Sequence, residues 1–165
     1  MKNMPKTSSA DLKMLRHAVA TVVYRGAKTF RDAPEDFGTF RIKAKSRTPI
    51  EIVAHMGDLF DWALSMAKGE GIWRESVPQS WDEEVARLYA SLKEFDAFLA
   101  NAPTIECSLE KLLQGPIGDA MTHVGQLAML RHLIGSPIRG ENYFKADIAV
   151  GQVGPAQPPP RREFD

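Results

Sequence analysis

The sequence is poor in cysteine and contains no long hydrophobic run. Its one cysteine, Cys107, cannot form a disulfide within the chain, which is typical of a reducing compartment. We interpret this thiol as a structural, half-buried side chain, because no histidine adjoins it. No stretch reaches the roughly 18 apolar residues of a membrane-spanning helix. Residues 1–9 also lack the apolar segment of a signal peptide. We therefore expect a cytoplasmic protein that has no membrane partner.

The chain also lacks an excess of charge of either sign. Its 165 residues include 21 Lys or Arg and 21 Asp or Glu, so the formal net charge is zero. Such a balance attracts no polyanion over long distances, and we do not expect nucleic acid as a partner. Apolar residues make up 44% and charged residues 25%, as in folded globular proteins. The length suits a single domain, 1–165, with a core at about 8–138 and an extended tail at 139–165.

Motifs of common catalytic sites are missing as well. The sequence has no glycine-rich phosphate loop, no Gly-x-Ser-x-Gly elbow and no Cys-x-x-Cys pair. What the chain does contain is apolar residues at helical spacing, in four stretches of about 20 residues each. The predicted helices run from Ser9 to Phe30, from Pro49 to Lys68, from Trp81 to Ala100 and from Pro116 to Ile134.

Each predicted helix begins at a recognisable start motif. In three of them a hydroxyl residue precedes an acidic residue by three positions, as in a capping box: Ser8 with Asp11, Thr48 with Glu51, and Ser80 with Glu83. The fourth start is marked by Gly115-Pro116, and a shorter helical piece is expected at Ser108 to Leu113.

These helices predict an all-α fold, a four-helix bundle with long crossover connections and an extended C-terminal tail. The connections are about 12 to 18 residues long, so a simple up-down-up-down order is not required. Pro155 and the run Pro158–Pro160 exclude a helix in the tail. We expect Tyr143, Phe144 and Ile148 to pack onto the bundle.

One helix face carries residues of the types that bind metals. Asp119 and His123 are four positions apart on the last predicted helix, so their side chains lie one turn apart on one face. His55 lies at the edge of the apolar face of the second helix. If that edge faces the last helix, the three residues form a 2-His-1-carboxylate set with open coordination positions. Gln126 lies beside them and is a candidate hydrogen-bond donor in a second shell.

The residues alone leave two interpretations of this set. Two neutral imidazoles and a carboxylate suit Zn or Ni, and also Fe or Mn. Alternatively, His55 and His123 are buried side chains satisfied by their neighbours, and Asp119 is an acid favoured by the dipole of the first helical turn. The other two histidines, His17 and His132, are predicted to face outward.

Two further clusters are noticeable in the connections. The basic residues are Arg41, Lys43, Lys45 and Arg47, and the tryptophans near the second connection are Trp62, Trp73 and Trp81. We interpret the basic segment as a solvated loop rather than a phosphate site. We interpret the tryptophans as packing under a loop rather than as the mouth of a pocket.

The chain resembles the DinB superfamily of metal-binding four-helix bundles. The resemblance rests on Thr48–Leu59 and on His123-Val124-Gly125-Gln126-Leu127, which is similar to the family's His-Arg-Gly-Gln-Leu element, and it covers about residues 8–138. The family usually has three histidine ligands. His55 and His123 match the first and the last, whereas Asp119 stands at the middle position.

The resemblance implies an activity and a set of partners. A divalent metal held by His55, Asp119 and His123 would lower the pKa of a low-molecular-weight thiol or a water. The protein would then be a thiol-dependent S-transferase or hydrolase that acts on a small electrophile, and it would form a homodimer. The alternative is a non-catalytic bundle, either a small-molecule binder or a structural dimer, with a vestigial metal site.

Overall fold

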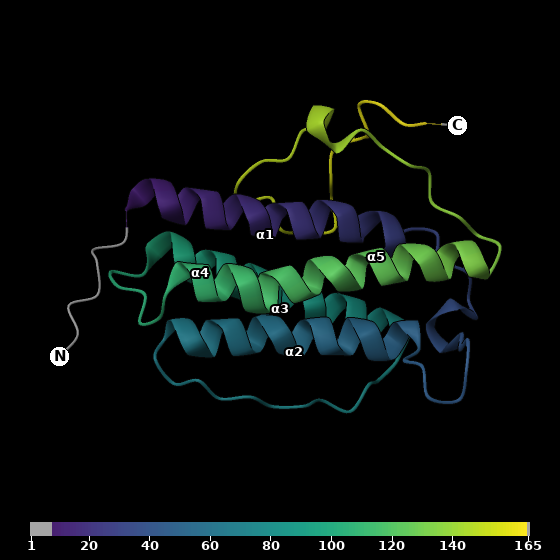
Figure 1. The fold of residues 1–165 in the computed structure, drawn as a ribbon, viewed down its shortest axis with the longest axis horizontal. Helices are drawn as coiled ribbons and strands as arrows, with labels where there is room; N and C mark the ends of the chain where they lie inside the picture. Colours follow the sequence, from purple (N-terminus) through teal and green to yellow (C-terminus); the bar gives the residue numbers. More distant parts are fainter. Residues whose placement is uncertain (1–7, 165) are drawn as a thin grey trace.

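The computed structural model describes residues 8–164, which form a four-helix bundle (Figure 1). The long helices are α1 (Ser9–Phe30), α2 (Pro49–Ala67), α3 (Trp81–Asn101) and α5 (Gly118–Leu133). Four short helical segments accompany them: η1 (Phe37–Thr39), α4 (Leu109–Leu112), η2 (Leu113–Ile117) and η3 (Tyr143–Lys145). The all-α prediction is therefore confirmed. Most of the segment interpreted above as lacking a signal peptide, residues 1–7, lies outside the described residues.

Side-chain caps fix the beginnings of the first three long helices. The hydroxyls of Thr48 and Ser80 accept from the backbone N–H three residues on, and Glu51 and Glu83 accept from the cap N–H groups in return. Both capping boxes are thus complete. At α1, Ser8 accepts from the N–H of Asp11. Because these motifs act locally, the sequence locates the three helix starts to the residue.

The start predicted at Gly115-Pro116 is wrong. The helical backbone begins instead after Ser108, which caps α4, and it continues through the π-helical turn η2 into α5. Pro116 lies inside η2. A proline ring clashes with the carbonyl four residues earlier in a regular α-helix, and the wider π turn relieves that clash. The short piece predicted at Ser108 to Leu113 and the last helix are therefore one continuous rod.

The bundle does not follow an up-down-up-down order. Figure 1 shows that α2 and α3 run in the same direction, because the connection 68–80 passes back along the whole of α2. Arg87, in the second turn of α3, accordingly contacts Asp58 in the middle of α2. At the other end of the bundle, Glu106 after α3 donates its N–H to the carbonyl of Ala67. The long crossover connection was predicted, and it returns α3 parallel to α2.

Each helix contributes fully buried side chains to one core. α2 packs against α3 and α5, and α1 packs against the same two helices. The rings of Phe60 in α2 and Phe95 in α3 pack 6.0 Å apart at its centre. Val19 of α1 and Leu127 of α5 are also fully buried. This arrangement places one face of α2 directly against α5, where the predicted metal ligands lie.

The C-terminal tail is mostly extended and folds back over α1, as Figure 1 shows. Its two ends meet in a single antiparallel bridge between Glu141 and Glu163. Glu141 is buried and accepts from the hydroxyl of Tyr24, 2.7 Å away. Of the tail residues predicted to pack, Tyr143 contacts Tyr24 edge-on, whereas Phe144 is 98% exposed. The prediction for Phe144 is wrong, since its short 3-10 turn points this ring into solvent.

No helix among the described residues is both long and apolar enough to cross a lipid bilayer.

Candidate metal centre

The structure brings the three predicted ligands together between α2 and α5. His55 Nε2 lies 3.5 Å from Asp119 Oδ2, and His123 Nε2 lies 3.5 Å from Asp119 Oδ1. The two imidazole rings are 5.0 Å apart and nearly perpendicular. Each residue offers one ligand atom within 4.8 Å of the others. The carboxylate thus lies between two imidazoles, as the spacing of four on α5 requires.

Burial differs among the three side chains. The His123 residue is 7% exposed. The side chain of His55 is 19% exposed and that of Asp119 is 46% exposed. The carboxylate is therefore the most exposed of the three groups, and the two imidazoles are more deeply buried. An open side of this kind is what a metal site needs in order to admit water or a substrate.

His123 is held in one tautomer by Gln126. The Nδ1 atom of His123 lies 2.8 Å from the amide oxygen Oε1 of Gln126, one turn further along α5. An amide oxygen only accepts, so Nδ1 carries the hydrogen and Nε2 presents its lone pair toward Asp119. The sequence predicted Gln126 beside the ligands as a donor, and the structure corrects that role to acceptor. Fixing the second ring nitrogen in this way is a common feature of metal-binding histidines.

The environment of His55 favours its neutral form. Burial lowers the pKa of His55 below 6.5, and the electrostatic influence of Arg47 and of His123 acts in the same direction. A hydrogen bond and the charge of Asp119 oppose the shift without reversing it. A neutral imidazole is the form that binds metals.

Two tryptophans flank His55. The ring of Trp73, from the connection 68–80, meets His55 edge-on at 5.7 Å, and Trp62 meets Trp73 at the same distance. Trp81 does not join them and packs against Phe37 in the core instead. The expected cluster of three tryptophans is therefore a pair, and this pair forms an aromatic wall beside the imidazole.

The donor set fits a divalent transition metal. Zn–N and Zn–O bonds of about 2.0–2.1 Å place tetrahedral ligand atoms about 3.3 Å from one another. The two carboxylate–imidazole distances are 3.5 Å, each to a different oxygen of Asp119, and one ligand atom from each of the three residues lies within 4.8 Å of the others. Three protein ligands of the N, N, O type are usual for Zn, Ni, Fe or Mn sites that retain open positions. The fit concerns the residues alone and does not select one of these metals.

A cleft of about 360 Å³ is lined in part by His55. Its walls come from the connection 41–47, from the first three turns of α2 and from the connection that follows α2. Three of the four basic residues singled out in the sequence line it, namely Arg41, Lys45 and Arg47. The basic segment is thus the wall of a cleft beside a candidate ligand, and describing it as a solvated loop is incomplete.

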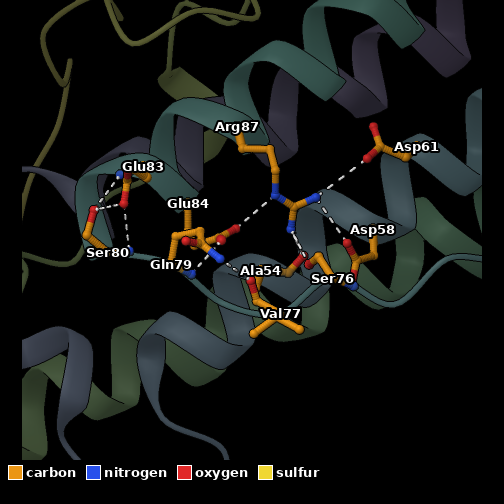
Figure 2. A network of polar contacts seen from close by, with 10 residues as sticks. All are labelled: Ala54, Asp58, Asp61, Ser76, Val77, Gln79, Ser80, Glu83, Glu84 and Arg87. Carbon is orange, nitrogen blue, oxygen red and sulfur yellow. Dashed lines mark hydrogen bonds and ion pairs between the residues drawn. The ribbon is translucent and has the colours of Figure 1, made fainter.

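A polar network fastens the connection 68–80 to the bundle (Figure 2). Arg87 of α3 donates to Asp58 and to the Ala54 carbonyl on α2, and to the hydroxyl of Ser76 in the connection. It also pairs with Glu84, which is 2% exposed. The connection that carries Trp73 is thereby held against α2 and α3.

Sequence reasoning did not find Arg87, Trp73 or Arg47 as parts of the site. Arg87 and Glu84 are three residues apart on α3, a spacing that signals an ion pair but not its contacts with α2. Trp73 and Arg47 lie in connections, whose paths have no periodic pattern to read. Their positions depend on the direction of α3 and on the loop that this direction requires.

The remaining candidates behave in simpler ways. His132 is exposed, as predicted, whereas His17 is half-buried and does not face fully outward as predicted. Burial raises the pKa of the Cys107 thiol, which supports its interpretation as a structural side chain.

The chain matches no family model, no curated protein and no solved structure.

Proposed function

We propose that this protein is a divalent-metal-dependent enzyme of the DinB-like type, with the metal held by His55, Asp119 and His123. The proposed activity is that of a thiol-dependent S-transferase or a hydrolase that acts on a small electrophile. Zn and Ni are the first candidates for the metal, followed by Fe and Mn. A homodimer of such bundles in the cytoplasm belongs to the same proposal.

One observation carries the proposal: the ring of His123 is locked with Nε2 toward Asp119. The hydrogen bond from Nδ1 to Gln126 Oε1, at 2.8 Å, fixes the tautomer. The lone pair of Nε2 therefore points at the carboxylate that His55 also approaches. Two buried histidines that served only packing would not require this orientation. An aspartate that was present only for its favourable interaction with the helix dipole would not need two imidazoles beside it.

The chain's own residues would perform the remaining tasks. A bound divalent ion supplies Lewis acidity, which lowers the pKa of a thiol or a water. The exposed side of Asp119 leaves the metal position accessible from solvent, whereas the two imidazoles shield it on the side of the bundle. Trp73 and Trp62 would exclude water on one side and offer an apolar surface to the electrophile.

The test is elemental analysis of protein purified without a metal-affinity tag. We expect about one equivalent of a divalent transition metal per chain, as a single three-ligand site would hold. His55→Ala and Asp119→Ala should lose that metal. His132→Ala removes an exposed imidazole from the same helix and should retain it, which makes it the matched control. Metal-loaded protein is then assayed for transfer of low-molecular-weight thiols to electrophiles.

The alternative function predicts a different result. If wild-type protein contains no metal, even after incubation with Zn or Ni, the enzyme proposal fails. The bundle would then be a small-molecule binder or a structural dimer with a vestigial site. Equal metal loss in His132→Ala would also contradict the proposal, because the metal would then be bound at the surface.

A further inference from the structure

The cleft beside His55 has an uneven distribution of paired and unpaired charges. Arg41 donates to both carboxylate oxygens of Glu51 and to the carbonyl of Ser46, so its charge is compensated. Asp58, at the inner wall, is compensated by Arg87 and by the N–H of Ser76. The polar groups of these pairs already have partners, and a ligand would gain little from them.

Two cations of the cleft have no such partner. Among the described residues, Lys45 and Arg47 form no side-chain hydrogen bond or ion pair, although both line the cleft. The one acidic group in the lining that is likewise unpaired is Glu75, on the opposite connection. The uncompensated charge on the side of 41–47 is therefore positive. Arg47 also lies close enough to His55 for its charge to act on that imidazole.

The backbone around the cleft distinguishes between two kinds of anion. Phosphate sites usually use free N–H groups at a helix N-terminus. At α2 Pro49 has no N–H, and Glu51 donates its N–H to the hydroxyl of Thr48, so the first turn retains the N–H of Ile50 alone. One N–H does not form a phosphate cradle, and the main recognition groups are side chains, one guanidinium fork and one ammonium. A planar carboxylate matches that pair, because arginine binds it with two parallel hydrogen bonds.

We propose that this cleft is a carboxylate-binding subsite, in which Lys45 and Arg47 hold the carboxylate of a small organic acid beside His55. Its volume, about 360 Å³, lies in the range of small-molecule sites. In the proposed enzyme, this subsite would select carboxylate-bearing thiols or electrophiles and orient them toward Asp119. That role rests on the proposed function, whereas the binding itself does not.

The binding is tested by nuclear magnetic resonance titration of the full chain in the presence of a chelator. Succinate is the probe, dimethyl succinate is the uncharged control, and inorganic phosphate is the competing anion. We expect succinate to shift the amide signals of residues 44–47 and 51–55 in a saturable manner. Dimethyl succinate should produce no saturable shift, because it offers no negative charge to the two cations.

A matched pair of double variants assigns the binding to named residues. Lys45→Ala with Arg47→Ala should weaken succinate binding at least about tenfold, since the charge-assisted hydrogen bonds of both side chains are removed. Lys13→Ala with Lys43→Ala changes the net charge equally at exposed positions outside the cleft, and it should bind succinate like the wild type. All four positions are exposed on the surface, so both variants should remain folded.

Three results would overturn the inference. The first is no saturable shift at these amides, and the second is equal weakening in both double variants, which indicates general charge attraction. The third is saturation by phosphate at lower concentration than by succinate, which would make the cleft a phosphate site. Because the titration is done without metal, failure of the subsite and failure of the metal centre are separate outcomes.

Discussion

Asp119 is the residue at which the two imidazoles of the candidate site converge. Its two carboxylate oxygens face His55 and His123 separately, each at 3.5 Å. At 46% exposed, the side chain keeps substantial contact with water. A histidine at this position would contribute a neutral ligand, whereas aspartate adds a negative charge to the set. The carboxylate therefore makes the site harder and more suited to a divalent cation than to a neutral guest.

The contact between Gln126 and His123 leads to a prediction about metal affinity. Gln126→Ala removes the acceptor that fixes the imidazole tautomer, and we expect metal affinity to fall about 10- to 100-fold. Gln126→Glu keeps an acceptor oxygen at the same reach and should retain most of the affinity. Competition against a chelator of known affinity measures both variants. If Ala and Glu at this position behave alike, the orienting role assigned to Gln126 is wrong.

The lowered pKa of His55 predicts a pH dependence of stability. In the unfolded chain the imidazole regains its ordinary pKa of 6.5. Between the lowered folded pKa and 6.5, the unfolded state binds more protons than the folded state. The free energy of unfolding must therefore decrease as the pH falls through this window.

The measurement is urea unfolding of metal-free protein between about pH 7 and pH 5. The midpoint of wild-type protein should fall more steeply with decreasing pH than that of His55→Gln, which cannot bind the proton. Parallel slopes for the two proteins would show that His55 titrates normally in the fold.

How far the candidate site could be predicted differs from residue to residue. The spacing of Asp119 and His123 is a local property of one helix, so their common face followed from the sequence. The approach of His55 depends on α2 lying against α5, which came only from the resemblance. Trp73 and Arg47 reach the site through irregular connections, so nothing periodic in the sequence indicated their positions.

At the scale of the helices, two glycines provide a matched test of the Arg87 network. A Cβ at Gly57 would lie 2.8 Å from the Arg87 guanidinium, whereas nothing lies within 4 Å of a Cβ at Gly125. Alanine normally stabilises an open helical position by about 0.5–1 kcal/mol, and we expect this for Gly125→Ala.

Gly57→Ala should lower the free energy of unfolding, in contrast to Gly125→Ala. The added methyl group must displace a guanidinium that is held by Asp58, Glu84 and the Ala54 carbonyl. We expect a loss of about 1–3 kcal/mol in the free energy of unfolding, measured by urea denaturation. A stabilised Gly57→Ala variant would mean that Arg87 moves away without cost, and the network would not fasten the connection as described.

The helix starts differ in how well local sequence motifs predict them. Thr48 and Ser80 cap their helices through contacts within four residues, and these starts are correct. Pro116 was interpreted as the first residue of a helix, which is its commonest helical position. It lies instead inside a π turn, because the helix already begins after its cap Ser108. The sequence alone does not show which of the two start motifs, Ser108 or Gly115-Pro116, begins the helix.

At the scale of the whole molecule, the tail is joined to the bundle through Glu141. This carboxylate accepts from Tyr24, and it pairs with Lys28 at 3.0 Å. Burial and the nearby Glu141 raise the pKa of Tyr24, so the phenol keeps its proton and donates a hydrogen bond at neutral pH. Glu163 pairs with the same Lys28 but is more exposed, with 26% of its side chain accessible.

Glu141 and Glu163 therefore allow a paired comparison of the tail. Glu141→Ala leaves the buried hydroxyl of Tyr24 without its acceptor, and we expect a loss of about 2–3 kcal/mol in stability. Glu163→Ala removes a partly exposed partner and should cost less than about 1 kcal/mol. Thermal unfolding together with limited proteolysis of residues 139–164 measures both effects. Equal, small losses would indicate that the tail adheres weakly to α1.

The parallel course of α2 and α3 has an electrostatic consequence. Two neighbouring helices in the same direction place both positive ends of their dipoles at one end of the bundle. The first turns there carry Glu51 on α2 and Asp82, Glu83 and Glu84 on α3, which offset that accumulation. The cleft beside His55 opens at this same end. α1 and α5 run the opposite way and bring their negative ends to this same end (Figure 1). The two pairs of helices therefore largely cancel one another's dipoles, in a molecule whose formal net charge is also zero.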